Sequence, residues 1–125
     1  MADVLAVLVS HLKSGPWRVY AEMPHNFELK SLPAINIVQV GPSARSPALN
    51  GLGVDWIDFD CDLYIDHTQW VSGQAQRLAG HLRQHLTQLH SGGVRFIDAS
   101  RPEKRPDRNT NIRRLSVTVT VAVPA

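Results

Sequence analysis

The chain has 125 residues, of which 43% are hydrophobic and 19% charged, and its net charge at neutral pH is +2. This composition is typical of a soluble globular domain and excludes wholesale disorder, while the small net charge argues against strong nucleic-acid binding by the chain as a whole. The length suffices for one domain with a real core but not for two, so we expect residues 1–125 to form one unit.

The N-terminal part is predicted to contain one helix and two strands. Residues 2–14 carry apolar side chains at helical spacing and end before a Gly-Pro pair. This apolar start has no basic residues before it, and His11 and Lys13 interrupt it, so we expect neither a signal peptide nor a membrane span. Residues 17–23 alternate weakly and residues 32–40 are rich in β-branched side chains, which indicates a strand in each.

A long segment without clear periodicity follows at residues 41–53. It is rich in Gly, Pro, Ser and Asn, and Arg45 is its single charged residue. Because its length exceeds that of most connections, we predict a flexible loop that serves as a contact point for a partner.

The second half is predicted to contain three strands and one long helix. Residues 55–66 alternate between apolar side chains and Asp, which places the two kinds on opposite faces of a strand. A leucine stripe predicts a helix over about residues 66–90. A strand at 94–97, a polar arm at 99–111 and a strand of alternating valines at 112–123 follow. This order favours an α+β fold, with a mainly antiparallel twisted sheet of about four to five strands and two helices packed on one face.

Charge is distributed unevenly between two segments. Asp58, Asp60 and Asp62 form a row of carboxylates on one face of the strand at 55–66. Carboxylates two residues apart repel each other, so this row requires solvent, a cation or a basic partner. Residues 101–114, by contrast, contain six basic residues and two acidic ones. We therefore expect an interface with a neighbouring subunit or partner that includes Asp58, Asp60, Asp62, Arg101, Arg105, Arg108, Arg113 and Arg114.

The sequence contains no convincing catalytic or metal-binding pattern. The single cysteine, Cys61, lies on the apolar face of its strand and is interpreted as a small buried side chain. His81 and His85 are four residues apart on the predicted helix, but a zinc site needs a third ligand, so we interpret them as packing or solvated side chains. A strand also holds carboxylates too far apart to wrap around calcium. We expect no catalytic residues, no metal and no cofactor.

Four segments of the second half occur in a characteristic order. They are the acidic strand at 58–64, the A-x-x-L-A helix at 75–82, the proline-bearing arm at 101–109, and Ile112-Arg113-Arg114 before the alternating valines. In these segments the chain resembles the tail terminator proteins of long-tailed bacteriophages, especially those that infect actinobacteria. The first half is similar only in layout, through its N-terminal helix and the strand that begins near residue 32.

The resemblance implies a structural role. Such a protein forms a hexameric ring on the finished tail tube, stops polymerisation of the tail tube protein and offers a docking surface to the head/neck connector protein. It is located in the virion, at the head-proximal end of the tail, after assembly in the host cytoplasm. DNA passes through the lumen without specific binding, and no membrane is involved.

Several alternatives remain open at the level of sequence. One is a neck or head-closure connector protein of the same virion, and a second is a small nucleic-acid-binding domain, although the basic arm lacks aromatic residues that stack on bases. A third is an enzyme that uses two carboxylates of the Asp row as an acid/base pair. The pattern also leaves open whether the Asp row faces the lumen of a ring or an interface between subunits.

Overall fold

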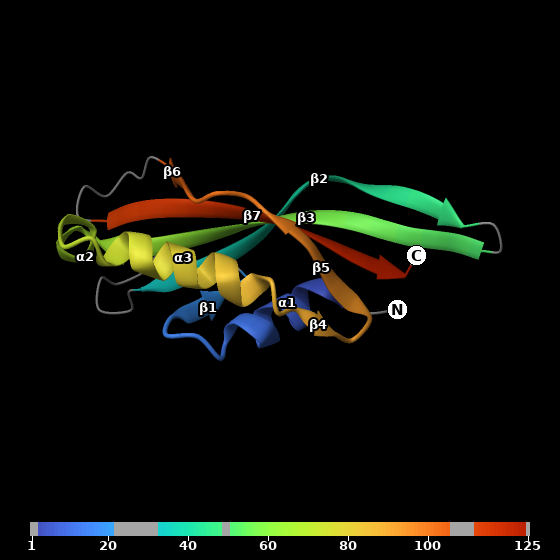
Figure 1. Ribbon diagram of the computed structural model, residues 1–125, viewed down its shortest axis with the longest axis horizontal. Coiled ribbons are helices and arrows are strands. Elements are labelled where there is room, and N and C mark those ends of the chain that lie inside the picture. Colours follow the sequence, from blue (N-terminus) through green and yellow to red (C-terminus); the bar gives the residue numbers. More distant parts are fainter. Residues whose placement is uncertain (1–2, 22–32, 49–50, 106–111, 125) are drawn as a thin grey trace.

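The computed structural model describes residues 3–21, 33–48, 51–105 and 112–124. Helices and strands occur in separate groups along the chain, as in the predicted α+β class, and the sheet has more strands than the sequence indicates (Figure 1). The elements are α1 (Val4–Leu12), β1 (Arg18–Tyr20), β2 (Ala34–Ala48), β3 (Gly51–Asp66), α2 (His67–Val71), α3 (Gln74–Leu86), β4 (His90–Ser91), β5 (Val94–Ala99), β6 (Glu103–Arg105) and β7 (Ile112–Pro124).

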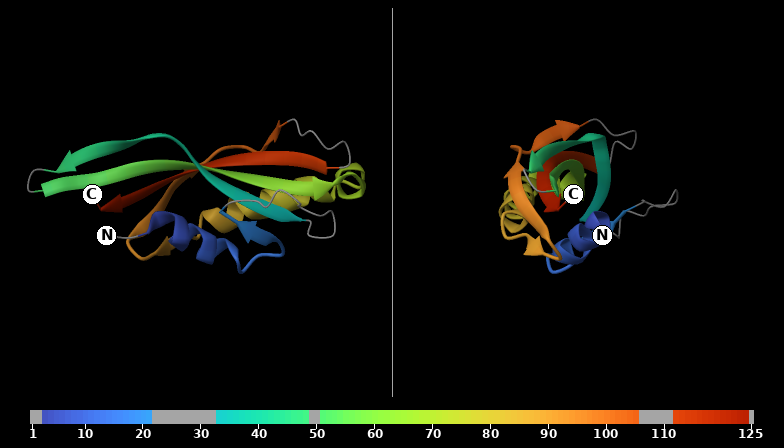
Figure 2. Two further views of the ribbon diagram at one scale, coloured as in Figure 1. Left: turned by 180° about the vertical axis from the view of Figure 1, so that it is seen from behind. Right: turned by 90° about the vertical axis from the view of Figure 1, so that its right-hand side faces the viewer.

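The strands form one mixed sheet. Its order is β1-β2-β3-β7-β5-β4, and β6 pairs with β7 on the same edge as β5. The β1–β2 pair is parallel and the other pairs are antiparallel, as the prediction of a mainly antiparallel sheet requires. The sheet is strongly curved when the molecule is seen end-on, and α1 and α3 lie on one side of it (Figure 2).

The core lies between the two main helices and one face of the sheet. Alternation along β3 buries Phe59, Cys61 and Leu63, and alternation along β7 buries its valines. Leu8 and Leu12 of α1, and the alanines and leucines of α3, complete the same cluster. Each buried leucine contributes about 2 kcal/mol through the removal of apolar surface from water. The sequence therefore predicted correctly which face of both long strands is buried.

Cys61 is the single cysteine of the chain, and its side chain is fully buried. Burial, with smaller contributions from the charges of Asp62 and Asp60, raises the pKa of the Cys61 thiol well above its ordinary value. We expect the native protein at pH 8 to remain unreactive toward a chromogenic disulfide reagent, and the protein unfolded in guanidinium to release one equivalent of chromophore. Rapid release from the native protein would contradict this burial.

The single long helix predicted over residues 66–90 is two helices in the structure. Gly73 separates them with a positive φ of 82°, a backbone conformation that favours glycine. Val71 lies at helical spacing from Ala75 and Leu78, which would place it on the buried face of a continuous helix, yet it is 70% exposed at the end of the short helix α2. The stripe is continuous in sequence across this break, which is why its spacing alone did not reveal the break.

The prediction of a loop at residues 41–53 is wrong, because the described residues of this segment belong to strands. β2 and β3 run through this segment as a hairpin, with residues 49–50 outside the described part. Pro42 and Pro47 fall at the two register shifts of the β2–β3 ladder, where a missing backbone N–H is tolerated. The hairpin extends past the end of β7, away from the helices (Figure 1).

The polar arm predicted at residues 99–111 is partly strand. β5 ends at its first residue and β6 occupies Glu103–Arg105, opposite the first half of β7. The remainder, residues 106–111, lies outside the described residues, and Arg108 is among these. The arm thus returns along the edge of β7, which brings its charged side chains to the sheet.

Candidate functional site

The face of the sheet opposite the helices carries the acidic row, and we call it the outer sheet face. It comprises the residues of β2, β3, β5, β6 and β7 that alternate with the core residues. The pairing register aligns them in four rows across the strands: Asp98, Thr120, Asp58 and Val40; Thr118, Asp60 and Val38; Glu103, Ser116, Asp62 and Asn36; Arg105, Arg114, Tyr64 and Ala34. Acidic residues therefore occupy its centre. Arg105 and Arg114 lie at one end, and Arg95 lies at the other, opposite Ala122, which also pairs with Trp56.

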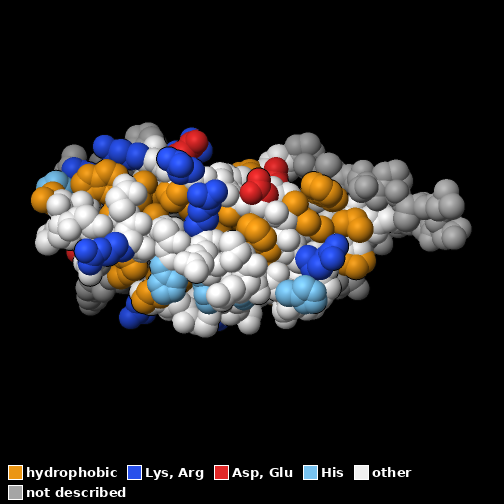
Figure 3. Space-filling model, viewed as in Figure 1, with side chains coloured by type: hydrophobic (Ala, Val, Ile, Leu, Met, Phe, Trp, Pro, Cys, Tyr) orange, Lys and Arg blue, Asp and Glu red, His pale blue; other side chains and the backbone are white. Residues whose placement is uncertain are grey.

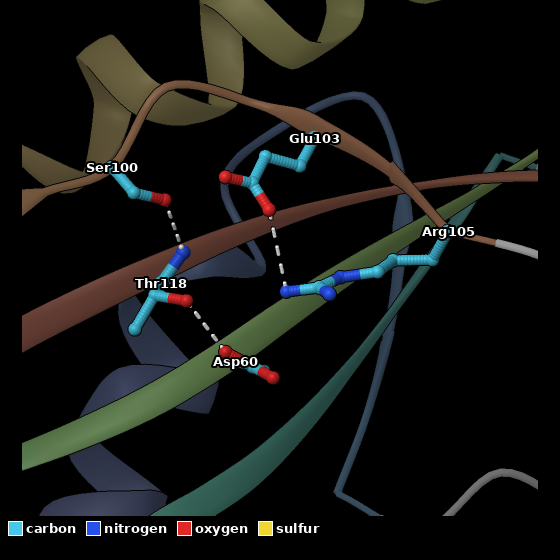
Figure 4. Close-up of polar contacts among 5 residues, drawn as sticks. All are labelled: Asp60, Ser100, Glu103, Arg105 and Thr118. Atoms are coloured by element: carbon cyan, nitrogen blue, oxygen red, sulfur yellow. Dashed lines mark hydrogen bonds and ion pairs between the residues drawn. The ribbon is translucent and has the colours of Figure 1, made fainter.

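Threonines of β7 hydrogen-bond two of the carboxylates across the strand pair. The Thr118 hydroxyl donates to Asp60 Oδ1 over 2.7 Å, and the Thr120 hydroxyl donates to Asp58 Oδ1 over 2.6 Å. The backbone N–H of Thr118 in turn donates to Ser100 Oγ at 2.9 Å. Figure 4 shows this chain of contacts beside the Glu103–Arg105 ion pair of β6. A hydroxyl provides a hydrogen bond to a carboxylate oxygen but no opposite charge, so the two threonines do not compensate the charge of Asp58 and Asp60.

The Thr118–Asp60 and Thr120–Asp58 hydrogen bonds differ in exposure to solvent, so they should contribute differently to the free energy of unfolding. Asp60 is partly buried, whereas Asp58 is exposed. We expect Thr118→Val to lower the free energy of unfolding by about 1 kcal/mol, because it leaves a shielded carboxylate oxygen without its donor. Thr120→Val, the matched control, should change it by less than about 0.5 kcal/mol. Urea denaturation measures both, and equal losses would contradict the assignment.

Basic residues at one end of the outer sheet face find partners within the same chain. Arg114 Nη1 lies 3.9 Å from Asp62 Oδ2 and donates to the Tyr64 hydroxyl at 3.2 Å. Arg105 Nη2 lies 3.5 Å from Glu103 Oε2, in a pair whose side chains are half exposed and which therefore contributes little to stability. The structure thus pairs part of the basic segment with acidic residues of its own subunit.

The other predicted interface residues are placed differently. Arg113 alternates onto the opposite side of β7, and its Nη1 donates to the Ile112 carbonyl at 3.3 Å. Arg101 is exposed in the segment between β5 and β6. The outer sheet face thus brings together Asp58, Asp60, Asp62, Arg105 and Arg114.

Sequence reasoning missed three contributors to the outer sheet face. Asp98 joins the acidic centre from β5, opposite Thr120. Val38 and Trp56 stand 43% and 44% exposed beside the carboxylates. Trp56 shares the alternation of the Asp row, and that signal was available in the sequence. The position of Asp98 depends on a register shift in β5, which the sequence pattern does not predict.

Two buried polar atoms flank Asp62 on neighbouring strands. Asn36 Oδ1 and Ser116 Oγ flank Asp62 across the strands, and both atoms are buried without a hydrogen-bond partner among the described residues. Ser116 is only 2% exposed. Buried polar groups without a partner are uncommon in folded proteins.

The histidines of the helical side have a packing role. The ring of His11 stacks on that of His85 at 4.5 Å, and each Nε2 donates to the other residue's backbone carbonyl, at 2.8 and 2.9 Å. His81 contacts the edge of Trp17 at 5.3 Å. These contacts join α1 to α3. Within the described residues, no three His, Cys, Asp or Glu side chains gather closely enough to hold a metal ion.

No family model matches the chain, and no curated protein matches it. None of the described helices is long and apolar enough to cross a membrane.

Proposed function

We propose that this protein is a structural virion protein that forms a ring at the head-proximal end of a phage tail tube. There it ends polymerisation of the tube protein and presents a docking surface to the head/neck connector. Two things support the proposal: the resemblance of the second half to tail terminators, and the composition of the outer sheet face. No catalytic role is assigned to any residue.

The outer sheet face carries the proposal because its chemistry suits contact with protein. Asp58 and Asp60 are hydrogen-bonded by hydroxyls and form no ion pair among the described residues, while Val38 and Trp56 expose apolar surface beside them. Apolar residues mixed with charges of one sign are typical of a surface that a complementary partner covers. The projecting β2–β3 hairpin adds reach beyond the body of the molecule (Figure 1).

The test is electron microscopy of tail tubes grown with and without the purified protein. We expect density at one end of each tube and arrest of tube growth. Asp58→Lys/Asp98→Lys, which reverses two exposed charges of the outer sheet face, should leave tubes growing, and Asp58→Asn/Asp98→Asn should give an intermediate result. Tubes that lengthen at an unchanged rate, with bare ends, would overturn the proposal.

A further inference from the structure

The helical side of the molecule is free of carboxylates over long stretches of sequence. Residues 4–21 and 67–97, which include α1, β1, α2 and α3, contain no Asp or Glu. In and beside the helices these stretches contain Lys13, Arg77, Arg83, His11, His67, His81 and His85. Arg18 and Arg95 pair with Ala34 and Ala122, so the register puts these two on the side of the outer sheet face. Figure 3 shows Arg, Lys and His side chains spread over this side, with the acidic side chains mainly along its upper edge. Helix α3 therefore carries two arginines and no carboxylate, while the outer sheet face has an acidic centre.

The exposed face of α3 is also shaped for close contact. Gly80 lies in the middle of this helix, is exposed, and has open space around the position that a Cβ would occupy. One turn away on either side lie four exposed side chains that can all donate hydrogen bonds: Gln76, Arg77, Arg83 and Gln84. Glycine weakens a helix interior, and nothing in the described chain requires one here, so the position fits close approach by another molecule.

The outer sheet face offers what this helix lacks. Asp58 and Asp98 are exposed carboxylates on either side of Thr120, with Val38 and Trp56 exposed nearby. A donor-rich helix without carboxylates complements an acceptor-rich sheet in both charge and hydrogen bonding.

We infer that the exposed face of α3 in one copy docks on the outer sheet face of a second copy of this chain. Arg77 meets the carboxylates of Asp58 and Asp98, and Gly80 lets the helix lie close to the strands. The inference rests on the proposed ring function and names its subunit interface. Because the two surfaces differ and each repels its own kind, association is head-to-tail, the geometry that closes into rings.

Charge reversal tests this interface. The sheet variant is Asp58→Lys/Asp98→Lys, and the helix variant is Gln76→Glu/Arg77→Glu, whose new carboxylates lie near the α3 N-terminus and favour the helix. Sedimentation at low ionic strength should show self-association of the wild type, weakened about 100-fold in either variant alone. An equimolar mixture should regain it, because each variant keeps the surface that the other needs. Variants that assemble like the wild type, or a mixture that stays monomeric, would overturn the inference.

Substitutions of Gly80 test the interface without destabilising the subunit, so a loss of self-association cannot be attributed to unfolding. Gly80→Gln should raise Tm by about 3 °C, because glutamine is a better helix former, yet weaken self-association about tenfold by blocking close approach. Gly80→Ala is the matched control, with a similar gain in Tm and a smaller loss of association. Unchanged association in Gly80→Gln would exclude the exposed face of α3 from the interface.

The outcomes separate this interface from the proposed function. Rings at tube ends that form equally well with both charge variants would refute the interface and leave the function standing. Self-association that follows the charge variants, without any binding to tubes, would refute the function and leave the interface standing. A wild type that stays monomeric at about millimolar concentration and low salt would refute the interface outright, because at that concentration even a weak specific contact is populated.

Discussion

Gly15→Ala is expected to lower the free energy of unfolding by about 2–4 kcal/mol, through overpacking and the loss of a hydrogen bond. A Cβ at this position would overlap the ring of Trp17. That ring is 7% exposed and belongs to the core, and its Nε1 donates to the Leu12 carbonyl at 2.8 Å. The indole therefore closes the end of α1, and a methyl group at residue 15 forces it out of place.

Chemical denaturation of Gly15→Ala and Gly80→Ala measures this effect against a matched control. Both replace glycine by alanine, but the Cβ at residue 80 meets open space. The control should gain about 0.5–1 kcal/mol, as expected for alanine in a helix. Equal stability of the two variants would show that Trp17 does not fill the space beside Gly15.

Alternation was the signal that predicted most of the fold. In β3 it separated Phe59, Cys61 and Leu63, which are buried, from Asp58 and Asp60 on the other face. Two-residue periodicity is strong there because one face of the strand packs on helices and the other does not. The same reasoning predicted that Asp58, Asp60 and Asp62 share one face of the sheet, as the register shows.

Pairing between strands was beyond the reach of these patterns. The second half of β2, which ends at Ala48, pairs with β3 through backbone hydrogen bonds, and such bonds leave little mark on a segment rich in Gly, Pro and Ser. Likewise, the contact between Arg114 and Asp62 depends on the register of β7 against β3. The sequence showed separate basic and acidic segments, but it could not show that they partly neutralise each other within one subunit.

Neutralising the carboxylates at the centre of the outer sheet face should show whether this face lies at a subunit interface or lines the lumen of a ring. The change is Asp58→Asn/Asp60→Asn, with Asp62 retained because it lies against Arg114. We expect the isolated protein to keep its Tm, since the threonine hydroxyls can donate to an amide oxygen as they do to a carboxylate.

Assembly, in contrast, should fail in the Asp58→Asn/Asp60→Asn variant. If the two carboxylates meet basic side chains of a neighbouring subunit, their loss leaves those cations buried without partners, a defect that weakens association by about 100-fold or more. Electron microscopy of particles from infected cells should then show overlong tails or tails without heads. Had the carboxylates lined a channel for DNA, the particles would assemble normally, and only the rate of DNA ejection would change, because a negative wall repels phosphates. Complete particles with unchanged thermal stability would therefore exclude the interface and favour the lumen.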